Sequence, residues 1–372
     1  MKPGTPAEFD ADDERQARAA WSALAEPGDR DAHKLVAEVG AVRALRRVLS
    51  GAGKARWRVR APDLNPRREL RTVERFGGRL LIPGDPEWPQ EITALGVDTP
   101  FCLWVRGPLD LESATRRAAA IVGARACTPY GEYVATDLGD GCALRDVTVV
   151  SGAAYGIDGA AHKGALAGGG PTIAVLASGV DRAYPRGHEA LIDRIATMGA
   201  VVSEVPPGRA PTRLRFVERN RLIAALARVT VVVEAAHHSG ARGTAMRAIR
   251  MGRPVGAVPG PVTSASSYGC HRLIRDDGAI CVTSADEVAE LALPMGECLP
   301  EPPPPPSDPL HDLGPAERRV VDALPARSPA SIGSITRAAG LVESDVVAAL
   351  TRLADAGLAV EDRAGWRREG VG

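Results

Sequence analysis

The stretch that decides the fold runs from Val147 to Ala167 and reads VTVVSGAAYGIDGAAHKGALA. It begins with a short β-branched apolar run, continues through a glycine-rich turn, and ends in a segment rich in alanine and leucine. This is the order strand, loop, helix. Because the apolar run is continuous rather than alternating, it predicts a strand that is buried on both faces.

The same order recurs along the middle of the chain. Apolar runs lie at 118–123, 147–150, 172–176, 200–205, 229–233, 254–258 and 279–282. Buried strands joined by right-handed crossovers predict an α/β fold, namely a doubly wound, Rossmann-like domain with a parallel sheet. Ligands of such sheets bind at the carboxyl ends of the strands, so the binding residues are expected in the turns that follow these runs.

Composition limits the class of protein. The 372 residues are 45% hydrophobic and 25% charged, and their formal net charge is zero, so any site for a polyanion must be built locally. No apolar run is long enough for a membrane span and the N-terminus lacks the apolar core of a signal peptide, which predicts a cytoplasmic protein without a membrane partner. Six scattered cysteines without a C-x-x-C pair suggest neither a disulfide framework nor a zinc site.

Proline and glycine mark the domain boundaries. Five consecutive prolines, Pro302 to Pro306, predict a semi-rigid linker. The expected organisation is an N-terminal helical domain at 1–75, an extended Rossmann-like domain at 76–296, a Pro-rich linker at 297–310 and a tail domain at 311–372.

The first two turns are rich in glycine. Gly123, Gly152 and Gly156 permit tight turns, and backbone amides at the following helix N-termini are expected to form an anion cradle. The alternative that these glycines serve only close packing stays open. Neither G-x-G-x-x-G nor G-x-x-x-x-G-K-[ST] occurs, which disfavours NAD and P-loop nucleotides as cofactors, so no cofactor is expected.

A basic concentration follows. The segment 209–253 contains ten arginines and only two acidic residues, Glu218 and Glu234, which gives a local charge of +8. The arginines lie at 209, 213, 215, 219, 221, 228, 242, 247, 250 and 253. Individual members are also compatible with solvated helix faces. Arg219-Asn220-Arg221 is the most particular part, because guanidinium forks suit phosphates.

The third turn, from Glu234 to Ala245, places Ser239, Gly240 and Thr244 in a phosphate-sized loop that is capped into a helix. His237 and His238 are adjacent and would point apart on a strand end, so no metal site is expected.

In the second turn, Asp158 and His162 are four residues apart and could act as an acid/base pair. We favour the alternative that Asp158 stabilises the helix N-terminus and His162 packs nearby.

Taken together, the turns resemble the DNA-processing protein A family, also called Smf. The matching motifs, in order, are Ile121-Val122-Gly123-Ala124-Arg125, Ser151-Gly152-Ala153-Ala154-Tyr155-Gly156-Ile157-Asp158, Ala177-Ser178-Gly179-Val180-Asp181 with Tyr184-Pro185, Ser203-Glu204, Arg219-Asn220-Arg221, Ser239-Gly240-Ala241 with Thr244-Ala245, and Val258-Pro259-Gly260. The resemblance implies a bacterial cytoplasmic protein that binds and protects single-stranded DNA and helps to load the RecA recombinase during recombination or natural transformation. It also implies a homodimer joined through the Rossmann-like domain, and no catalysis.

Carried over from the family, the DNA groove uses Arg125, the Tyr155 position and Arg186. The complete set of expected DNA-binding residues is Gly123, Arg125, Ser151, Gly152, Tyr155, Gly156, Asp158, Arg186, Arg219, Asn220, Arg221, Ser239, Gly240, Arg242 and Thr244. Two departures stand out: a basic residue is common where Tyr155 stands, and Leu-Ile is common where Arg242-Gly243 stands. Tyr155 loses a phosphate contact but offers a ring for base stacking.

The flanking domains carry weaker signals. The N-terminal helices resemble the family's small SAM/HhH-like lead domain. In the tail, expected helices at 314–323, 332–339 and 344–356 precede a hairpin and resemble a winged helix. From Glu297 onward twelve acidic residues outnumber eight arginines, so we favour a protein-contact role for the tail over duplex reading.

Two alternatives of other classes remain. The turn from Ser239 to Thr244 partly matches the Gly-Gly-x-Gly-Thr turn of phosphoribohydrolase-like Rossmann enzymes that process nucleotides. A transcription regulator acting through the tail is the third hypothesis.

Overall fold

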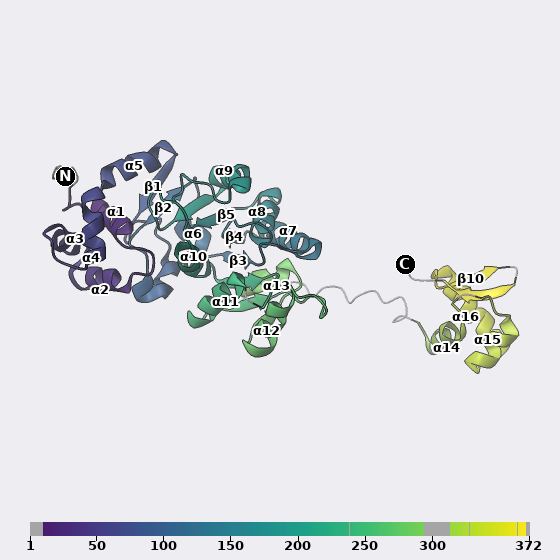
Figure 1. Cartoon of the computed structure of the whole chain (residues 1–372). Coiled ribbons are helices and arrows are strands. Elements are labelled where there is room, and N and C mark those ends of the chain that lie inside the picture. Colours follow the sequence, from purple (N-terminus) through teal and green to yellow (C-terminus); the bar gives the residue numbers. More distant parts are fainter. Residues whose placement is uncertain (1–9, 238, 294–312, 327, 363, 370–372) are drawn as a thin grey trace. The chain divides into compact units, whose positions relative to one another are not determined.

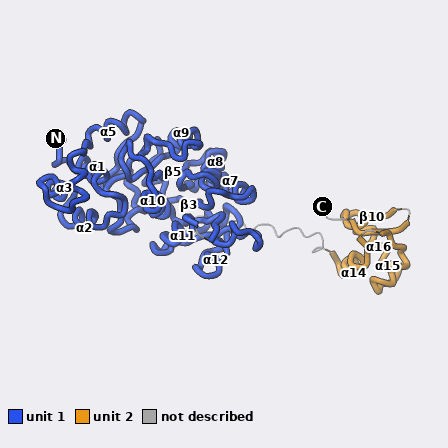
Figure 2. The backbone as a smooth tube through the Cα atoms, in the orientation of Figure 1, with its two compact units in different colours: residues 1–300 blue, residues 301–372 orange. Residues whose placement is uncertain are grey.

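The structure, a computed structural model, describes residues 10–237, 239–293, 313–326, 328–362 and 364–369. The chain divides into two compact units, 1–300 and 301–372, which Figure 2 colours separately. The predicted linker at 297–310 lies outside the described residues.

The larger unit is built on a sheet that has nine strands in the described part of the chain (Figure 1). The strands are β1 Gly78–Leu81, β2 Leu103–Arg106, β3 Ala118–Val122, β4 Thr148–Ser151, β5 Thr172–Leu176, β6 Ala200–Ser203, β7 Val229–Val232, β8 Val255–Ala257 and β9 Ile280–Cys281. Their order across the sheet is β1-β2-β6-β5-β4-β3-β7-β8-β9. Strands β3 to β9 pair in parallel and coincide with the seven predicted apolar runs, whereas β1 and β2 add an antiparallel edge.

Helices cover both faces of the sheet. Those of this unit are α1 Glu14–Leu24, α2 Arg30–Val39, α3 Ala41–Leu49, α4 Ala55–Arg60, α5 Pro66–Arg75, α6 Leu111–Thr115, α7 Pro129–Ala143, α8 Ile157–Ala167, α9 Glu189–Met198, α10 Arg213–Ala225, α11 Gly240–Arg250, α12 Tyr268–Asp276 and α13 Ala285–Ala292, with 3₁₀ turns η1 Ala61–Asp63, η2 Gln90–Asp98 and η3 Arg186–His188. No helix among the described residues is long and apolar enough to cross a membrane.

Strand β3 explains why the sheet is covered twice. Its alternate residues Ala118, Ala120 and Val122 pack into one core with α10, α11 and α12. The residues between them, Ala119 and Ile121, pack into a second core with α7, α8 and α13. All five side chains are buried, as the continuous apolar run predicts. The prediction of a doubly wound α/β domain is confirmed.

The strand order positions the site. From β3 the chain winds through β4 and β5 to β6 on one side, and it then returns to continue with β7 to β9 on the other side of β3. The loops that follow β3 and β7 therefore diverge to opposite faces. The gap between such loops is the usual ligand-binding crevice of an open parallel sheet.

The N-terminal helices α1 to α4 surround two tryptophans. The rings of Trp21 and Trp57 meet edge to face at 5.5 Å, and Trp21 donates a hydrogen bond to the carbonyl of Ala41 at 3.0 Å. Trp104 of β2 donates to the Ser22 hydroxyl at 3.2 Å, so these helices contact the sheet within one compact unit. The boundary near residue 75 stays a prediction.

The second unit contains α14 Pro315–Ala323, α15 Ile332–Ala339 and α16 Glu343–Asp355, followed by a hairpin of β10 Ala359–Asp362 and β11 Gly365–Arg368. Buried aliphatic side chains of the three helices, including Val320, Ile335 and Leu350, form its core. The order of three helices and a hairpin matches the expected elements, and the winged-helix assignment stays a prediction.

Candidate functional site

The loop after β3 leads from Gly123 into α7 and is held by a buried carboxylate. Glu234, at the end of β7, accepts hydrogen bonds from the Thr128 amide at 2.9 Å and from the Thr128 hydroxyl at 2.6 Å. Thr128 is the N-cap of α7. Glu234 therefore fixes the start of α7 against the end of β7, which sets the width of the switch point.

The loop after β4 is organised by Asp158. The Gly152 amide donates to its carboxylate at 3.2 Å, and the nearby amides of Gly123 and Ala154 also favour its charged form. Burial raises the pKa of Asp158, and the nearby Arg219 guanidinium opposes that rise. Asp158 is therefore an internal anion that ties the first two turns together.

This arrangement corrects the predicted anion cradle. The Gly152 amide does bind a carboxylate, but that carboxylate is the chain's own Asp158. Sequence spacing shows that the amides are present, but it cannot show that a side chain in the first turn of α8 will bind one of them. The glycines themselves are needed for close packing: at Gly156, with a φ of 76°, a Cβ would lie 2.3 Å from the Ala124 carbonyl oxygen.

The loop after β7 opens α11. Ser239 caps the helix by accepting from the Ala241 amide at 3.2 Å. The Gly240 carbonyl accepts from Asn220 and from Thr244, each at 3.5 Å. These contacts hold α10 against the N-terminus of α11, whose amides point toward the crevice end of the sheet.

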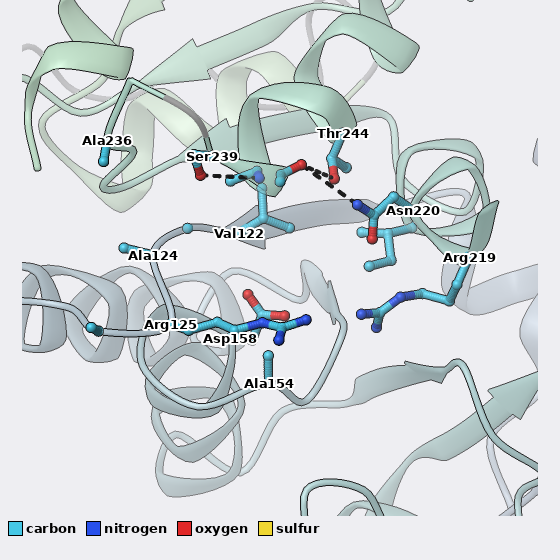
Figure 3. Close-up of a pocket in the computed structure, with 15 residues that line it drawn as sticks. Val122, Ala124, Arg125, Ala154, Asp158, Arg219, Asn220, Ala236, Ser239 and Thr244 are labelled. Carbon is cyan, nitrogen blue, oxygen red and sulfur yellow. Dashed lines mark hydrogen bonds between the residues drawn. The ribbon is translucent and has the colours of Figure 1, made fainter. Parts of the chain in front are cut away.

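These three turns enclose a crevice of about 390 Å³ at the switch point (Figure 3). Predicted residues that line it are Gly123, Arg125, Asp158, Arg219, Asn220, Ser239, Gly240 and Thr244. Figure 3 shows the side chains of Arg125 and Arg219 extending toward each other from opposite sides of the crevice. The structure thus brings eight of the predicted residues together in one cavity.

The two arginines differ in what they can do. Arg125 is exposed, so its guanidinium is accessible to a phosphate. Arg219 is buried and donates to the Val175 carbonyl at 2.5 Å, and burial lowers its pKa to about 10 against the opposing effect of Asp158. A Cβ at Gly152 would lie 2.1 Å from Arg219 Nη1, so Gly152 makes room for this side chain. Arg219 mainly balances the charge of Asp158.

Aromatic rings lie around Arg125. The Phe216 ring on α10 is 5.0 Å from the Arg125 guanidinium and 5.4 Å from the Tyr184 ring. Tyr184 is 44% exposed. We name Phe216 and Tyr184 the aromatic rim. Sequence reasoning missed it, because these residues are 32 positions apart and only the fold brings them together.

Tyr155, Arg186 and Ser151 lie outside the crevice. Tyr155 is 49% exposed and meets His188 edge to face at 4.8 Å. Arg186 is exposed on η3, next to Gly187, where a Cβ would touch the Tyr155 hydroxyl. Ser151 is buried and donates to the Ile121 carbonyl at 2.6 Å, so it joins β4 to β3.

Two predicted arginines do not reach the crevice. Arg221 is buried against Glu204 at 2.6 Å, and Arg242 lies 3.3 Å from Asp277. Neither lines the crevice. Both face away from it because adjacent residues on a helix point in directions about 100° apart.

The ten-arginine segment is not one basic face. Six of the ten arginines pair with a carboxylate, and for five of them that carboxylate lies outside the segment. The pairs are Arg215 with Glu26, Arg221 with Glu204, Arg228 and Arg253 with Glu91, Arg242 with Asp277 and, inside the segment, Arg247 with Glu218. The local charge of +8 counts only acids inside the segment. Much of the positive charge of this segment is therefore balanced by acids of the folded chain, as the alternative for individual arginines allowed.

The acid/base alternative is not supported by the geometry. His162 is buried, its Nδ1 lies 2.7 Å from the Thr172 hydroxyl, and burial lowers its pKa to about 3. Asp158 accepts from the Gly152 amide instead. The packing of His162 agrees with the favoured interpretation, whereas the stabilisation of the helix start by Asp158 stays a prediction. The ring of His237 stacks on Tyr268 at 5.0 Å, and His238 lies outside the described residues.

The chain is similar in sequence to known proteins. The family model described as DNA recombination-mediator protein A matches residues 79–292. A protein of Mycobacterium tuberculosis H37Rv is 46% identical over 95% of both chains, and the DNA processing protein DprA of Streptococcus pneumoniae is 40% identical over 55% of this chain and 71% of its own.

Solved structures agree with the sequence relatives. DNA processing protein A from Streptococcus pneumoniae superposes with a TM-score of 0.63 at 30% identity, covering 79% of this chain and 99% of that one. DNA processing protein A from Helicobacter pylori, in a structure that concerns its single-stranded DNA binding mode, gives a TM-score of 0.52 at 26% identity, covering 57% and 94%.

Proposed function

Because the chain belongs to the family of DNA recombination-mediator protein A, we propose that it binds single-stranded DNA at the switch-point crevice. The observation that carries the proposal is Arg125, an exposed guanidinium at the crevice, beside the aromatic rim and opposite the N-terminus of α11. This arrangement offers a phosphate a cation and a helix N-terminus, and it offers a base a ring.

The strand follows a short path in this proposal. Arg125 and the α11 amides bind phosphates at the crevice, and exposed Arg186 with Tyr155 extends the contact beyond it. Tyr155, which stands where the family commonly has a basic residue, contributes a ring face to a base. The nearby Arg219 guanidinium and the hydrogen bond from the Gly152 amide reduce the repulsion between the Asp158 carboxylate and the strand.

Gel shifts with a labelled oligonucleotide, in the absence of nuclease, test this proposal. We expect a single strand to be shifted and the matching duplex to be shifted poorly, because the bases of a duplex are not available for stacking. Tyr155→Ala is expected to weaken binding to the single strand, whereas Tyr133→Ala, which removes an exposed ring of α7, serves as the matched control. Equal binding of single strand and duplex would argue against the proposed contacts.

The larger role is protection of single-stranded DNA and loading of RecA during recombination, by a cytoplasmic homodimer. A dimer would place two crevices on one strand and raise the effective concentration at the second crevice, which compensates for the few phosphate contacts of one subunit. Light scattering measures the dimer directly. The lag of RecA ATPase activity on DNA coated with single-strand binding protein measures loading, and a lag that this protein does not shorten would contradict that role.

A nucleotide-processing activity is less well supported. Glu234, the carboxylate of the third turn, is buried and accepts two hydrogen bonds from Thr128, so it has a structural use already. We therefore propose a binding protein rather than an enzyme. Release of free base from a panel of nucleoside monophosphates, lost in Asp158→Asn, would favour the enzyme instead.

A further inference from the structure

A second cavity, of about 410 Å³, lies against α10 on the side away from the crevice. Glu218 and Arg221 of α10 line it, whereas Arg219 and Asn220 line the crevice, and the two cavities share no lining residue. Its other walls come from the turn at Gly28, from η2 and from α11. This cavity is therefore a separate place on the molecule.

Four guanidinium groups line this cavity, and we call it the arginine cavity: Arg30, Arg221, Arg247 and Arg250. Only two carboxylates, Asp98 and Glu218, share the lining. Gly28 lets the first turn approach closely: its φ is 80°, and a Cβ there would lie 2.9 Å from a Glu218 oxygen. A positive surplus inside a concave wall favours an anionic ligand.

The side chain of Arg221 is buried and only partly hydrogen-bonded. Its side chain is 5% exposed and one Nη atom donates to Glu204 at 2.6 Å. Its Nε and its other Nη have no hydrogen-bond partner among the described residues. Buried donors of a charged group are rarely left without an acceptor, because water no longer compensates them.

The remaining arginines are loosely held. Arg30 lies 3.4 Å from Asp98 and Arg247 lies 3.8 Å from Glu218, both longer than the 2.7–2.9 Å typical of a charge-assisted hydrogen bond. Arg250 is exposed. Burial lowers the pKa of Arg247, with Glu218 opposing and the neighbouring Arg221 and Arg250 adding to the effect. The guanidinium groups thus crowd one another without full compensation.

We propose that the arginine cavity binds a phosphate group, carried either by a free nucleotide or by the 5′ end of a DNA strand. The planar guanidinium matches the spacing of phosphate oxygens and binds them through two parallel hydrogen bonds. A bound phosphate would accept from Arg247 and Arg250 and would separate the crowded positive charges. Leu95 and Met251 supply an apolar wall on which the attached sugar or base can pack.

Calorimetric titration of the full chain with inorganic pyrophosphate is the first test. We expect Arg247→Gln and Arg250→Gln each to weaken pyrophosphate binding by about tenfold or more, because each removes a charge-assisted contact. Arg228→Gln is the matched control, since Arg228 belongs to the same arginine-rich segment but pairs with Glu91 at 3.0 Å and does not line the cavity. Pyrophosphate that fails to bind wild type, or that binds both cavity variants as it binds wild type, overturns the proposal.

A measurement on wild type does not depend on the folding of variants. Phenylglyoxal modifies accessible guanidinium groups, and mass spectrometry locates the modified residues. We expect pyrophosphate to protect Arg247 and Arg250 but not Arg228. Equal modification of all three with and without pyrophosphate contradicts the site.

Two further ligands distinguish the sources of the phosphate. If the site takes nucleotides, ATP binding weakens in Arg247→Gln as pyrophosphate binding does. If it takes strand ends, the preference for a 5′-phosphorylated over a 5′-hydroxyl oligonucleotide disappears in that variant. If neither ligand depends on Arg247, pyrophosphate is an adventitious ion only, and the proposal fails while single-strand binding at the crevice is unaffected.

Discussion

Replacing Arg125 with alanine removes an exposed guanidinium from the crevice, and we expect a smaller salt dependence of single-strand binding. Each neutralised phosphate contributes about 0.7 to the slope of log K against log salt on single strands. Arg125 and Arg186 are the exposed predicted arginines on this path, so one subunit is expected to neutralise about two phosphates, with a slope near 1.4 in magnitude. Arg125→Ala should reduce that slope to about 0.7.

Fluorescence anisotropy of a labelled thymidine oligonucleotide measures this slope. Between about 50 and 200 mM salt the wild-type affinity should fall roughly sevenfold, and that of Arg125→Ala about two- to threefold. Arg125→Lys keeps the charge and should keep the slope. Arg228→Ala removes an arginine that is paired with Glu91, so its slope should equal that of wild type. A slope that Arg125→Ala leaves unchanged would refute the assignment of Arg125 as a phosphate contact.

Three further predictions concern the stability of the fold. Gly156→Ala should lower the free energy of unfolding by about 1–3 kcal/mol in urea denaturation, because φ is positive there and the added Cβ meets the Ala124 carbonyl. Glu234→Ala should cost about 1–3 kcal/mol by the same measurement, since it leaves two Thr128 donors without their acceptor. Burial raises the pKa of Glu69 from 4.5 to about 7. The contribution of neutral Glu69 to the free energy of unfolding is therefore full below pH 4.5 and is lost as the pH rises through 7. Glu69→Gln stays neutral and should therefore raise Tm above that of wild type at pH 8 but not at pH 4.5, and an equal difference at both would contradict this.

The fold could be predicted because its signal is local. Strand β3 reads as five consecutive apolar residues, and both faces of that strand are buried in the structure. The switch point could be anticipated in the same way, since the turns after the runs at 118–123 and 229–233 carry the glycines and polar residues. Strands β1 and β2 were not predicted. They are antiparallel, and nothing in the sequence places them at the edge of the sheet next to β6.

The site could be predicted only in part, because charge and stacking depend on partners from elsewhere in the chain. Arg215 looks free in the sequence but pairs with Glu26, which lies 189 positions away. Phe216 shows the opposite case. The sequence draws attention to Arg219 nearby, whereas only the fold shows that the Phe216 ring lies beside Arg125. Residue type and spacing identify candidates for binding, whereas the partner of each side chain decides which of them remain available.

Two carboxylates lie near the crevice, and other residues of the chain hold each of them in place. The Asp158 carboxylate accepts from the Gly152 amide and lies near the Arg219 guanidinium, and Glu234 is held by Thr128, so both acids have structural uses. Their charges are used to fix the loops after β3 and β4 and the start of α7. The positive charge that remains accessible at the crevice is that of Arg125, on a loop that these two carboxylates hold in place. In the proposed function, binding by Arg125 and the structural use of Asp158 and Glu234 are parts of one arrangement, because the acids hold the turns from which the exposed cation is presented.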